Sequence, residues 1–159
     1  MEGKRSADSS VVLAQFMQPD HANHIGNVHG GWIMKLIDEA GGLCAIRHAR
    51  RPSVTVAIDS LQFHSPVHVG DLVTFTARLD YVGRTSMEAE VQVEAEDILS
   101  GQKTHTNSAY LVYVALDEAG RPVEVPPLKL ETDEEFARFE QGKRRQADRL
   151  ARAKRESDP

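Results

Sequence analysis

The chain has 159 residues, of which 40% are hydrophobic and 27% are charged, and its formal net charge is -5. This length and composition predict one globular domain with a sizeable core and argue against a disordered chain. The excess of acidic residues argues against nucleic acid as the main partner.

Residues 1–10 are polar and are expected to form a flexible end. They lack the apolar core of a signal peptide, and no apolar run in the chain reaches the roughly 20 residues that span a bilayer. The single cysteine, Cys44, allows no disulfide within the chain and indicates a reducing compartment. We therefore expect a cytoplasmic protein without membrane insertion, in which Cys44 is a core residue rather than a nucleophile.

The pattern of apolar residues predicts one early helix followed by several strands. A short apolar run over residues 11–17 fits a first strand, and a helix is expected from about residue 30 to residue 47. Further strands are predicted over residues 54–63, 72–81, 86–96 and 103–116. In the strand over 86–96, Glu and Gln alternate with Val, Ala and Met, which predicts one exposed and one buried face. One long helix and strands joined by short turns indicate an α+β fold with an antiparallel sheet.

Residues 129–159 form a separate, highly charged segment. Thr132 and Glu135 have the spacing of a helix capping box, so a helix is expected to begin here. Phe136 and Phe139 are among its few large apolar residues. We expect a solvated helix that packs through these two phenylalanines. The alternative, in which its basic residues hold phosphate groups of a ligand, stays open.

One carboxylate of the early helix, Asp38, is expected among small and apolar neighbours. On a helical wheel Asp38 falls beside Met34, Gly41 and Gly42, away from the charged face. The two glycines weaken a helix, so they indicate that another backbone packs very close. An ionised carboxylate in these surroundings is costly unless it is paired, and such surroundings suit a general base. A structural Asp bound to a backbone amide or a Lys is the alternative.

The loop before this helix carries two carboxamides, Asn23 and Asn27, and leads into Gly30-Gly31 at the expected helix start. A helix start has free N–H groups that can hold a developing negative charge, and glycine lets a ligand approach them. A carboxylate, an amide and an oxyanion site are therefore expected to lie together.

Three segments together resemble the hotdog-fold acyl-CoA thioesterases, in particular the cytosolic (brain-type) acyl-CoA hydrolases and their single-domain bacterial relatives. They are residues 23–42, with Gly-Asn-Val-His-Gly-Gly followed by Asp38, and residues 54–63 and 82–87. The resemblance implies a single hotdog domain over residues 11–128, with an antiparallel sheet wrapped around a long central helix, and a charged helix over 129–159. It implies hydrolysis of fatty acyl-CoA to fatty acid and CoA, with no cofactor other than the CoA of the substrate.

In this family two domains pair, and each site takes a loop Asn from one domain and a helix Asp from the other. Asn23 matches the first and Asp38 the second, which implies a homodimer with two complete sites, and the family often stacks three dimers into a hexamer. By this resemblance Gly31 N–H polarises the thioester carbonyl, and Asn23 orients the carbonyl or a water. Asp38 either activates the water or attacks the carbonyl to form an anhydride.

Six further residues are predicted to contact substrate: His29, Gly30, Asp59, Ser60, Arg84 and Ser86. His29 and Gly30 lie beside the expected helix start. Arg84 offers a bidentate fork to phosphate oxygens, although a plain surface hairpin is an equal alternative. Asp59 lies on the strand expected to follow the helix and the dimer seam, where its role is structural or substrate-facing.

Other chemistries find little support. The spacing of His21, His24 and His29 fits no zinc pattern, so no metal site is expected. Serine-hydrolase, dinucleotide and P-loop motifs are absent from the sequence. Two rivals remain: a hotdog enoyl-thioester hydratase or dehydratase that pairs His29 with Asp38, and a non-catalytic acyl-CoA-binding module.

Overall fold

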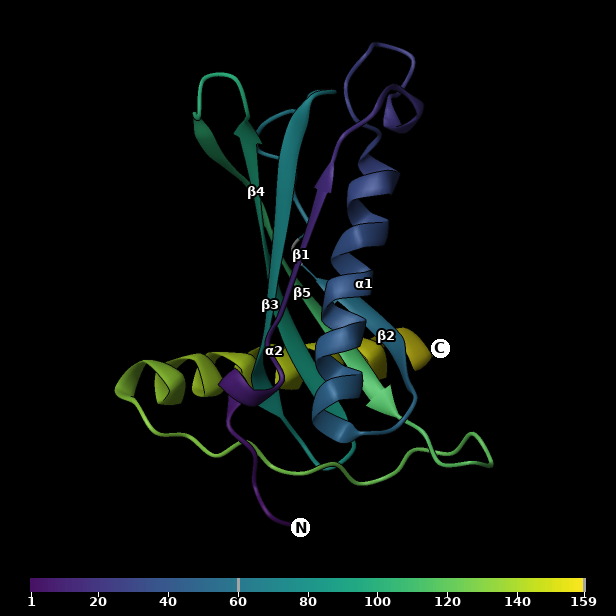
Figure 1. The fold of residues 1–159 in the computed structure, drawn as a ribbon. Coiled ribbons are helices and arrows are strands. Elements are labelled where there is room, and N and C mark those ends of the chain that lie inside the picture. Colours follow the sequence, from purple (N-terminus) through teal and green to yellow (C-terminus); the bar gives the residue numbers. More distant parts are fainter. Residues whose placement is uncertain (60, 159) are drawn as a thin grey trace.

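The computed structural model describes residues 1–59 and 61–158, and it contains one sheet with a helix on each face (Figure 1). Helix α1 (Gly30–Ala49) runs along one face, and helix α2 (Asp133–Ser157) crosses the other. The strands are β1 (Val11–Phe16), β2 (Ser53–Asp59), β3 (Asp71–Val82), β4 (Ser86–Asp97) and β5 (Lys103–Ala115). All pairings are antiparallel in the order β1-β3-β4-β5-β2, which confirms the predicted α+β fold.

Helix α1 forms the centre of the core. Its buried side consists of Ile33, Leu36, Ile37, Ala40, Gly41, Cys44, Ala45 and His48. Burial raises the pKa of the Cys44 thiol to about 12, so it stays neutral, as a core residue does. The helix ends at Arg50, whose φ of 56° is left-handed and cannot continue the helix. Neither described helix is long and apolar enough to cross a membrane.

The close contact predicted from Gly41 and Gly42 exists, but it involves a side chain rather than a backbone. A Cβ at Gly41 would lie 2.5 Å from the hydroxyl oxygen of Tyr113 on β5. A Cβ at Gly42 would lie 3.6 Å from the same ring, which is an ordinary contact. Only Gly41 is therefore required by space, because the buried Tyr113 ring fills the volume that a larger residue would need.

Gly41→Ala and Gly42→Ala should change stability in opposite directions. Gly41→Ala is expected to lower the free energy of unfolding by about 1–3 kcal/mol through overpacking against Tyr113. Gly42→Ala is expected to raise it by up to about 1 kcal/mol, because alanine favours the helix more than glycine does. Urea unfolding of both variants measures the difference, and equal effects would contradict the contact with Tyr113.

Helix α2 is more firmly attached than the sequence predicted, because its arginines pair with acids on the sheet. Arg145 donates to Glu88 of β4 at 2.7 Å, and Arg149 donates to Glu88 at 2.9 Å and to Asp59 of β2 at 2.6 Å. The expected exposure of the glutamate face of β4 is therefore wrong at Glu88, which is 1% exposed, and at the buried Glu90. The alternation of residues along β4 shows which side chains share a face, but it cannot show that α2 covers that face.

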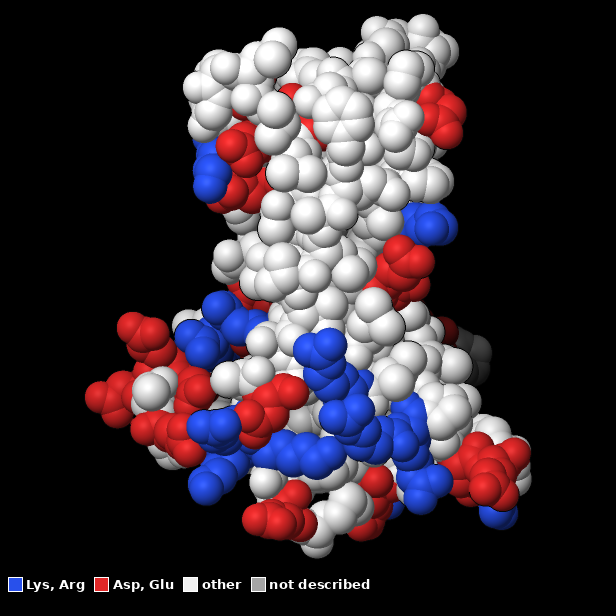
Figure 2. Space-filling model, in the orientation of Figure 1, with Lys and Arg blue, Asp and Glu red and all other residues white. Residues whose placement is uncertain are grey.

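Of the two phenylalanines expected to anchor α2, only Phe139 does so. Its ring packs against Tyr81, with 5.0 Å between the ring centroids, whereas Phe136 is exposed. Figure 2 shows charged side chains crowding the lower half of the molecule, where α2 and the end of α1 lie. The middle and upper part of the same face is mostly uncharged.

A second acidic cluster lies under the start of α2. Asp80 of β3 is buried and accepts from Arg78 at 3.1 Å, and Arg138 of α2 lies 3.5 Å away from it. Burial, with the carboxyl of Glu90 close by, raises the pKa of Asp80 from 3.8 to about 7. The folded protein therefore holds a proton here at pH values where the unfolded chain has released it.

This cluster predicts that stability falls as pH rises from about 4 to about 7. The folded state binds the extra proton in that window, so the free energy of unfolding drops by at most about 1.4 kcal/mol per pH unit. Asp80→Asn, which cannot ionise, should flatten the slope, whereas Glu118→Gln at an exposed turn should leave it unchanged. Thermal unfolding across this pH range tests the prediction, and a slope in Asp80→Asn equal to wild type would refute it.

Candidate active site

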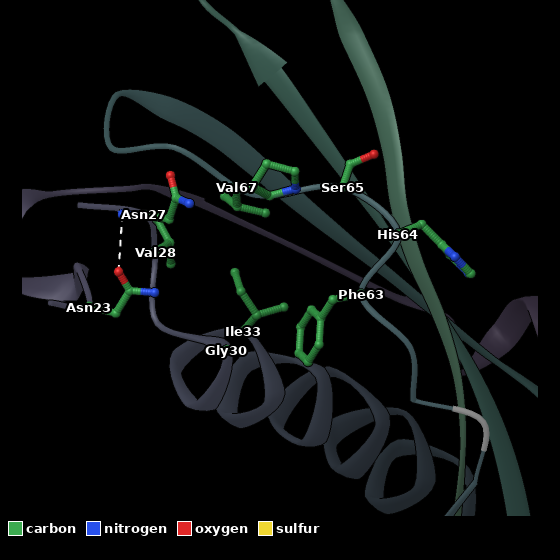
Figure 3. A pocket seen from close by; sticks show the side chains of 10 residues that line it. Asn23, Asn27, Val28, Gly30, Ile33, Phe63, His64, Ser65 and Val67 are labelled. Carbon is green, nitrogen blue, oxygen red and sulfur yellow. Dashed lines mark hydrogen bonds between the residues drawn. The ribbon is translucent and has the colours of Figure 1, made fainter. Parts of the chain in front are cut away.

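A pocket of about 310 Å³ lies where the loop before α1 meets the segment after β2 (Figure 3). It is lined by Asn23, Asn27, Val28, Gly30, Ile33, Phe63, His64, Ser65, Pro66 and Val67. The strand predicted to reach residue 63 ends at Asp59, so Phe63 and its neighbours belong to a loop that covers the start of α1. The pocket brings together the predicted residues Asn23 and Gly30.

The loop that carries Asn23 is fixed at both ends. Val28 N–H donates to the carbonyl of Val67 at 2.8 Å, and His29 N–H donates to the carbonyl of His21 at 2.8 Å. The His21 ring stacks on the Trp32 ring of α1, with 4.2 Å between centroids. His21 thus holds the loop against the helix, which gives it a structural role.

The hydrogen bonds of Asn23 determine which end of its amide faces the pocket. Its Oδ1 accepts from the N–H of Ile25 at 3.1 Å and of Asn27 at 3.2 Å. Its Nδ2 has no hydrogen-bond partner among the described residues and lies on the pocket side (Figure 3). Because the oxygen is already used, Asn23 can offer the pocket only donors.

The helix start differs from the prediction for Gly31. His29 is the N-cap residue of α1, and its Nδ1 accepts the N–H of Gly31 at 3.0 Å. Gly31 N–H is thus bonded to the cap, whereas Gly30 N–H has no partner within residues 1–59 and 61–158. The sequence did not indicate this, because Ser, Thr, Asp and Asn are the usual N-caps. At this end of α1 the backbone donor left free at the pocket, among the described residues, is therefore the N–H of Gly30 rather than that of Gly31.

Asp38 lies half-buried in the middle of α1 and is held by hydroxyl groups. Its Oδ1 accepts from Thr55 Oγ1 at 2.7 Å and from the Tyr113 hydroxyl at 3.0 Å. The Tyr113 hydroxyl also lies 3.1 Å from the main-chain oxygen of Asp38. The alternative considered from sequence, a bond to a backbone amide or a Lys, is therefore wrong among the described residues.

Thr55 and Tyr113 were both missed by sequence reasoning. They are directly opposite each other in the pairing of β2 with β5, and both reach α1. The sequence signals for their contact with α1 were indirect: the mixed polar and apolar pattern of the strand that holds Thr55, and the glycine at position 41. Neither signal names the partner strand.

Within one chain, Asn23 and Asp38 do not meet. Asn23 lies in the pocket at the start of α1, beside Gly30. Asp38 lies about 12 Å further along the axis of α1 from Gly30, at about 1.5 Å per residue. A single copy therefore contains the donor half and the carboxylate half of the predicted site at separate places.

Asp59 and Ser86 lie away from this pocket, at a second pocket of about 510 Å³ between α2 and the strands β2 and β5. Asp59 accepts from Arg149 at 2.6 Å, and Arg152 lies 3.7 Å from it. Of the two roles considered for Asp59, the structure therefore favours the structural one.

Arg84 lies in the turn between β3 and β4 and is largely exposed, 3.7 Å from Glu124. Ser60, also predicted to contact substrate, lies outside the described residues. Among the described residues, no group of three or more His, Cys, Asp and Glu could hold a metal ion.

The family model described as "Thioesterase superfamily" matches residues 25–101 of the sequence. Protein VdlD of Helicobacter pylori is 37% identical over 136 residues, which cover 85% of this chain and 78% of that protein. The chain belongs to the thioesterase superfamily. The human cytosolic acyl coenzyme A thioester hydrolase is 37% identical over 153 residues, 95% of this chain, but the chain spans only 40% of that protein's length.

Solved structures of the family match almost the whole fold. An apo-hexameric acyl-CoA thioesterase has a TM-score of 0.91 and 35% identity, covering 96% of this chain and 98% of that chain. An acyl-CoA hydrolase from Staphylococcus aureus, in complex with butyryl coenzyme A, coenzyme A and coenzyme A disulfide, has a TM-score of 0.87 and 31% identity. There the match covers 96% of this chain and 93% of that one. The predicted hotdog thioesterase fold is confirmed.

The capping role of His29 can be tested directly. His29→Ala removes the acceptor of the Gly31 N–H and is expected to lower the free energy of unfolding by about 1 kcal/mol. His29→Asn supplies another capping oxygen and should lose much less. Urea unfolding measures both variants, and equal losses would show that the ring nitrogen does not cap α1.

Proposed function

We propose that this protein hydrolyses acyl-CoA thioesters to a carboxylic acid and CoA, at a site that two copies build together. The observation that carries the proposal is the division of the site along α1. Unused donors lie at the helix start, and a hydroxyl-bound carboxylate lies about 12 Å away. Relatives named as acyl-CoA thioester hydrolases support the substrate class.

In the proposed reaction, the donors at the start of α1 bind the thioester carbonyl oxygen. The amide NH₂ of Asn23 and the N–H of Gly30 both lie there without a hydrogen-bond partner among the described residues, so Gly30 replaces Gly31 in the role expected from sequence. These donors stabilise the negative charge that the oxygen gains as the carbonyl carbon is attacked. His29 keeps the helix start in place.

Asp38 of the facing copy supplies the base. It takes a proton from water while the water oxygen attacks the carbonyl carbon, and the carbon–sulfur bond then breaks to release the CoA thiolate. In the other route Asp38 attacks the carbonyl carbon itself, the carbon–sulfur bond breaks to release the CoA thiolate, and water then hydrolyses the resulting anhydride. Both routes consume one water and give one carboxylic acid and one CoA thiol.

Solved variants of the Staphylococcus aureus hydrolase support these assignments. In them an asparagine, an aspartate or a threonine is replaced by alanine. The three residues have the same spacing along the chain as Asn23, Asp38 and Thr55. This agreement supports a role for Thr55, which the sequence alone did not indicate.

The surface around α1 and β2 supports pairing of two copies. β2 is an edge strand of the sheet, so one side of its backbone has no partner strand among the described residues. Exposed apolar side chains lie on the same two elements: Met34, Leu43, Ile46, Val54, Val56 and Ile58. Exposed edges and apolar patches mark interaction surfaces. We place the dimer contact here, and the hexameric relatives support a trimer of such dimers.

For the CoA phosphates we propose Arg84 and Ser86 at the turn between β3 and β4. The Arg84 side chain is exposed, and its one ion pair among the described residues is long, at 3.7 Å, so it is free to bind an anion. Ser86 lies at the second pocket, beside α2.

Mixing of variants tests whether two copies share each site. Asn23→Ala and Asp38→Asn should each reduce thiol release from acyl-CoA by about 100-fold or more. Unfolding and refolding the two variants together should restore up to about a quarter of wild-type activity, because half of the dimers are mixed and each has one intact site.

The control is Asp38→Asn refolded alone, which should recover nothing. No recovery in the mixed sample, despite formation of mixed dimers, would overturn the shared site. Hydration of an enoyl-CoA without thiol release would instead favour the hydratase.

A further inference from the structure

Tyr113 is buried at the contact between β5 and α1, and its position is tightly restricted. The side chain is 1% exposed, and its hydroxyl lies where a Cβ at Gly41 would be 2.5 Å away. The ring also touches the Gly42 position at 3.6 Å. Packing on the helix side therefore leaves the hydroxyl little freedom, and it is held next to Asp38.

Two hydroxyl donors converge on the same oxygen of Asp38. Thr55 donates to Oδ1 from β2 at 2.7 Å, and Tyr113 donates from β5 at 3.0 Å. The other oxygen, Oδ2, has no hydrogen-bond or ion-pair partner within residues 1–59 and 61–158. The carboxylate is therefore fixed by one oxygen and free at the other.

The Tyr113 hydroxyl keeps its proton under ordinary conditions. Burial, followed by the nearby charge of Asp38, raises the pKa of Tyr113 far above its usual value of 10. Tyr113 is thus a permanent donor to Asp38 and not itself an acid or base in the reaction.

We propose that Tyr113 is a positioning residue for thioester hydrolysis, which holds Oδ1 of Asp38 and aims the free Oδ2 at the water or the carbonyl carbon. The inference rests on the proposed function and adds a residue to it. Thr55 and Tyr113 come from the two strands that lie side by side at the edge of the sheet. The pairing of β2 with β5 therefore sets the orientation of the carboxylate.

Tyr113→Phe removes the hydroxyl and keeps the ring that packs against Gly41. We expect kcat for thiol release to fall by about 10- to 100-fold, because one hydrogen bond to a charged group is lost. KM should stay within about two-fold, since Tyr113 does not contact the substrate in the proposed site. A carboxylate that loses a donor is protonated at a higher pH, so the acidic limb of the kcat profile should move to higher pH.

Tyr110→Phe is the matched control, because Tyr110 lies on the same strand but faces Arg145 of α2. It should leave kcat and the acidic limb unchanged. Gly41→Ala is a second test that keeps the tyrosine, because the added methyl group displaces its hydroxyl from Asp38. We expect the same shift of the acidic limb, and thermal unfolding shows that each variant is folded.

Wild-type kcat and an unmoved acidic limb in folded Tyr113→Phe would overturn the positioning role. A loss of kcat without a shift of the limb, matched by Tyr110→Phe, would also overturn it by showing a purely structural effect. Failure of the proposed function itself looks different: Asp38→Asn would then release thiol as fast as wild type. In that case the inference about Tyr113 falls with it.

Discussion

The close approach of α1 to the sheet is the constraint on which the rest of this structure depends. The buried side of the helix carries Ala40, Gly41, Cys44 and Ala45 in succession, so the sheet can come near its axis. At the nearest point a tyrosine from β5 occupies the space left by a missing side chain. The same contact places two hydroxyl groups on the carboxylate of Asp38. Packing and the chemistry of the site thus share one cause.

The two faces of the sheet use different interactions. Toward α1 the contacts are almost entirely apolar, and they draw their stability from buried area. Toward α2 ion pairs join the packing of Phe139 on Tyr81, because arginines of the helix neutralise acids that the strands would otherwise bury alone. A buried ion pair adds less stability than its short distances suggest, but losing one partner leaves an uncompensated charge. Glu88, which meets both Arg145 and Arg149, is where this matters most.

Much of the fold and half of the candidate site could be predicted from sequence, because those features are local. The period of apolar residues marks α1 and the strands. Asn23 before α1 and Gly30 at its first position mark the pocket at its start. The partners of Asp38 could not be predicted in this way. Thr55 and Tyr113 reach it only through the register of β2 with β5, and the sequence does not state which strands are neighbours.

The sequence also left out two contacts of Glu88 and Gly31, for different reasons. The burial of Glu88 depends on a helix that follows it by more than forty residues, so alternation along β4 could not reveal it. The bond of the Gly31 N–H to the His29 ring could not be predicted, because histidine is not among the usual helix caps. Glu88 therefore depends on a partner far away in the sequence, whereas Gly31 depends on an unusual cap two residues before it.

The distance along α1 between its start, beside Asn23, and Asp38 means that a chain can be fully folded and still lack a complete site. In the proposed arrangement an isolated copy is folded and carries both half-sites, the donors at the start of α1 and the carboxylate of Asp38, but it has no complete active site. Turnover per molecule would then depend on total enzyme concentration and fade on dilution below the dissociation constant of the pair, while spectroscopic signatures of the native state persist. A compound that binds at the dimer interface and keeps the two copies apart would inhibit turnover without contacting Asn23 or Asp38.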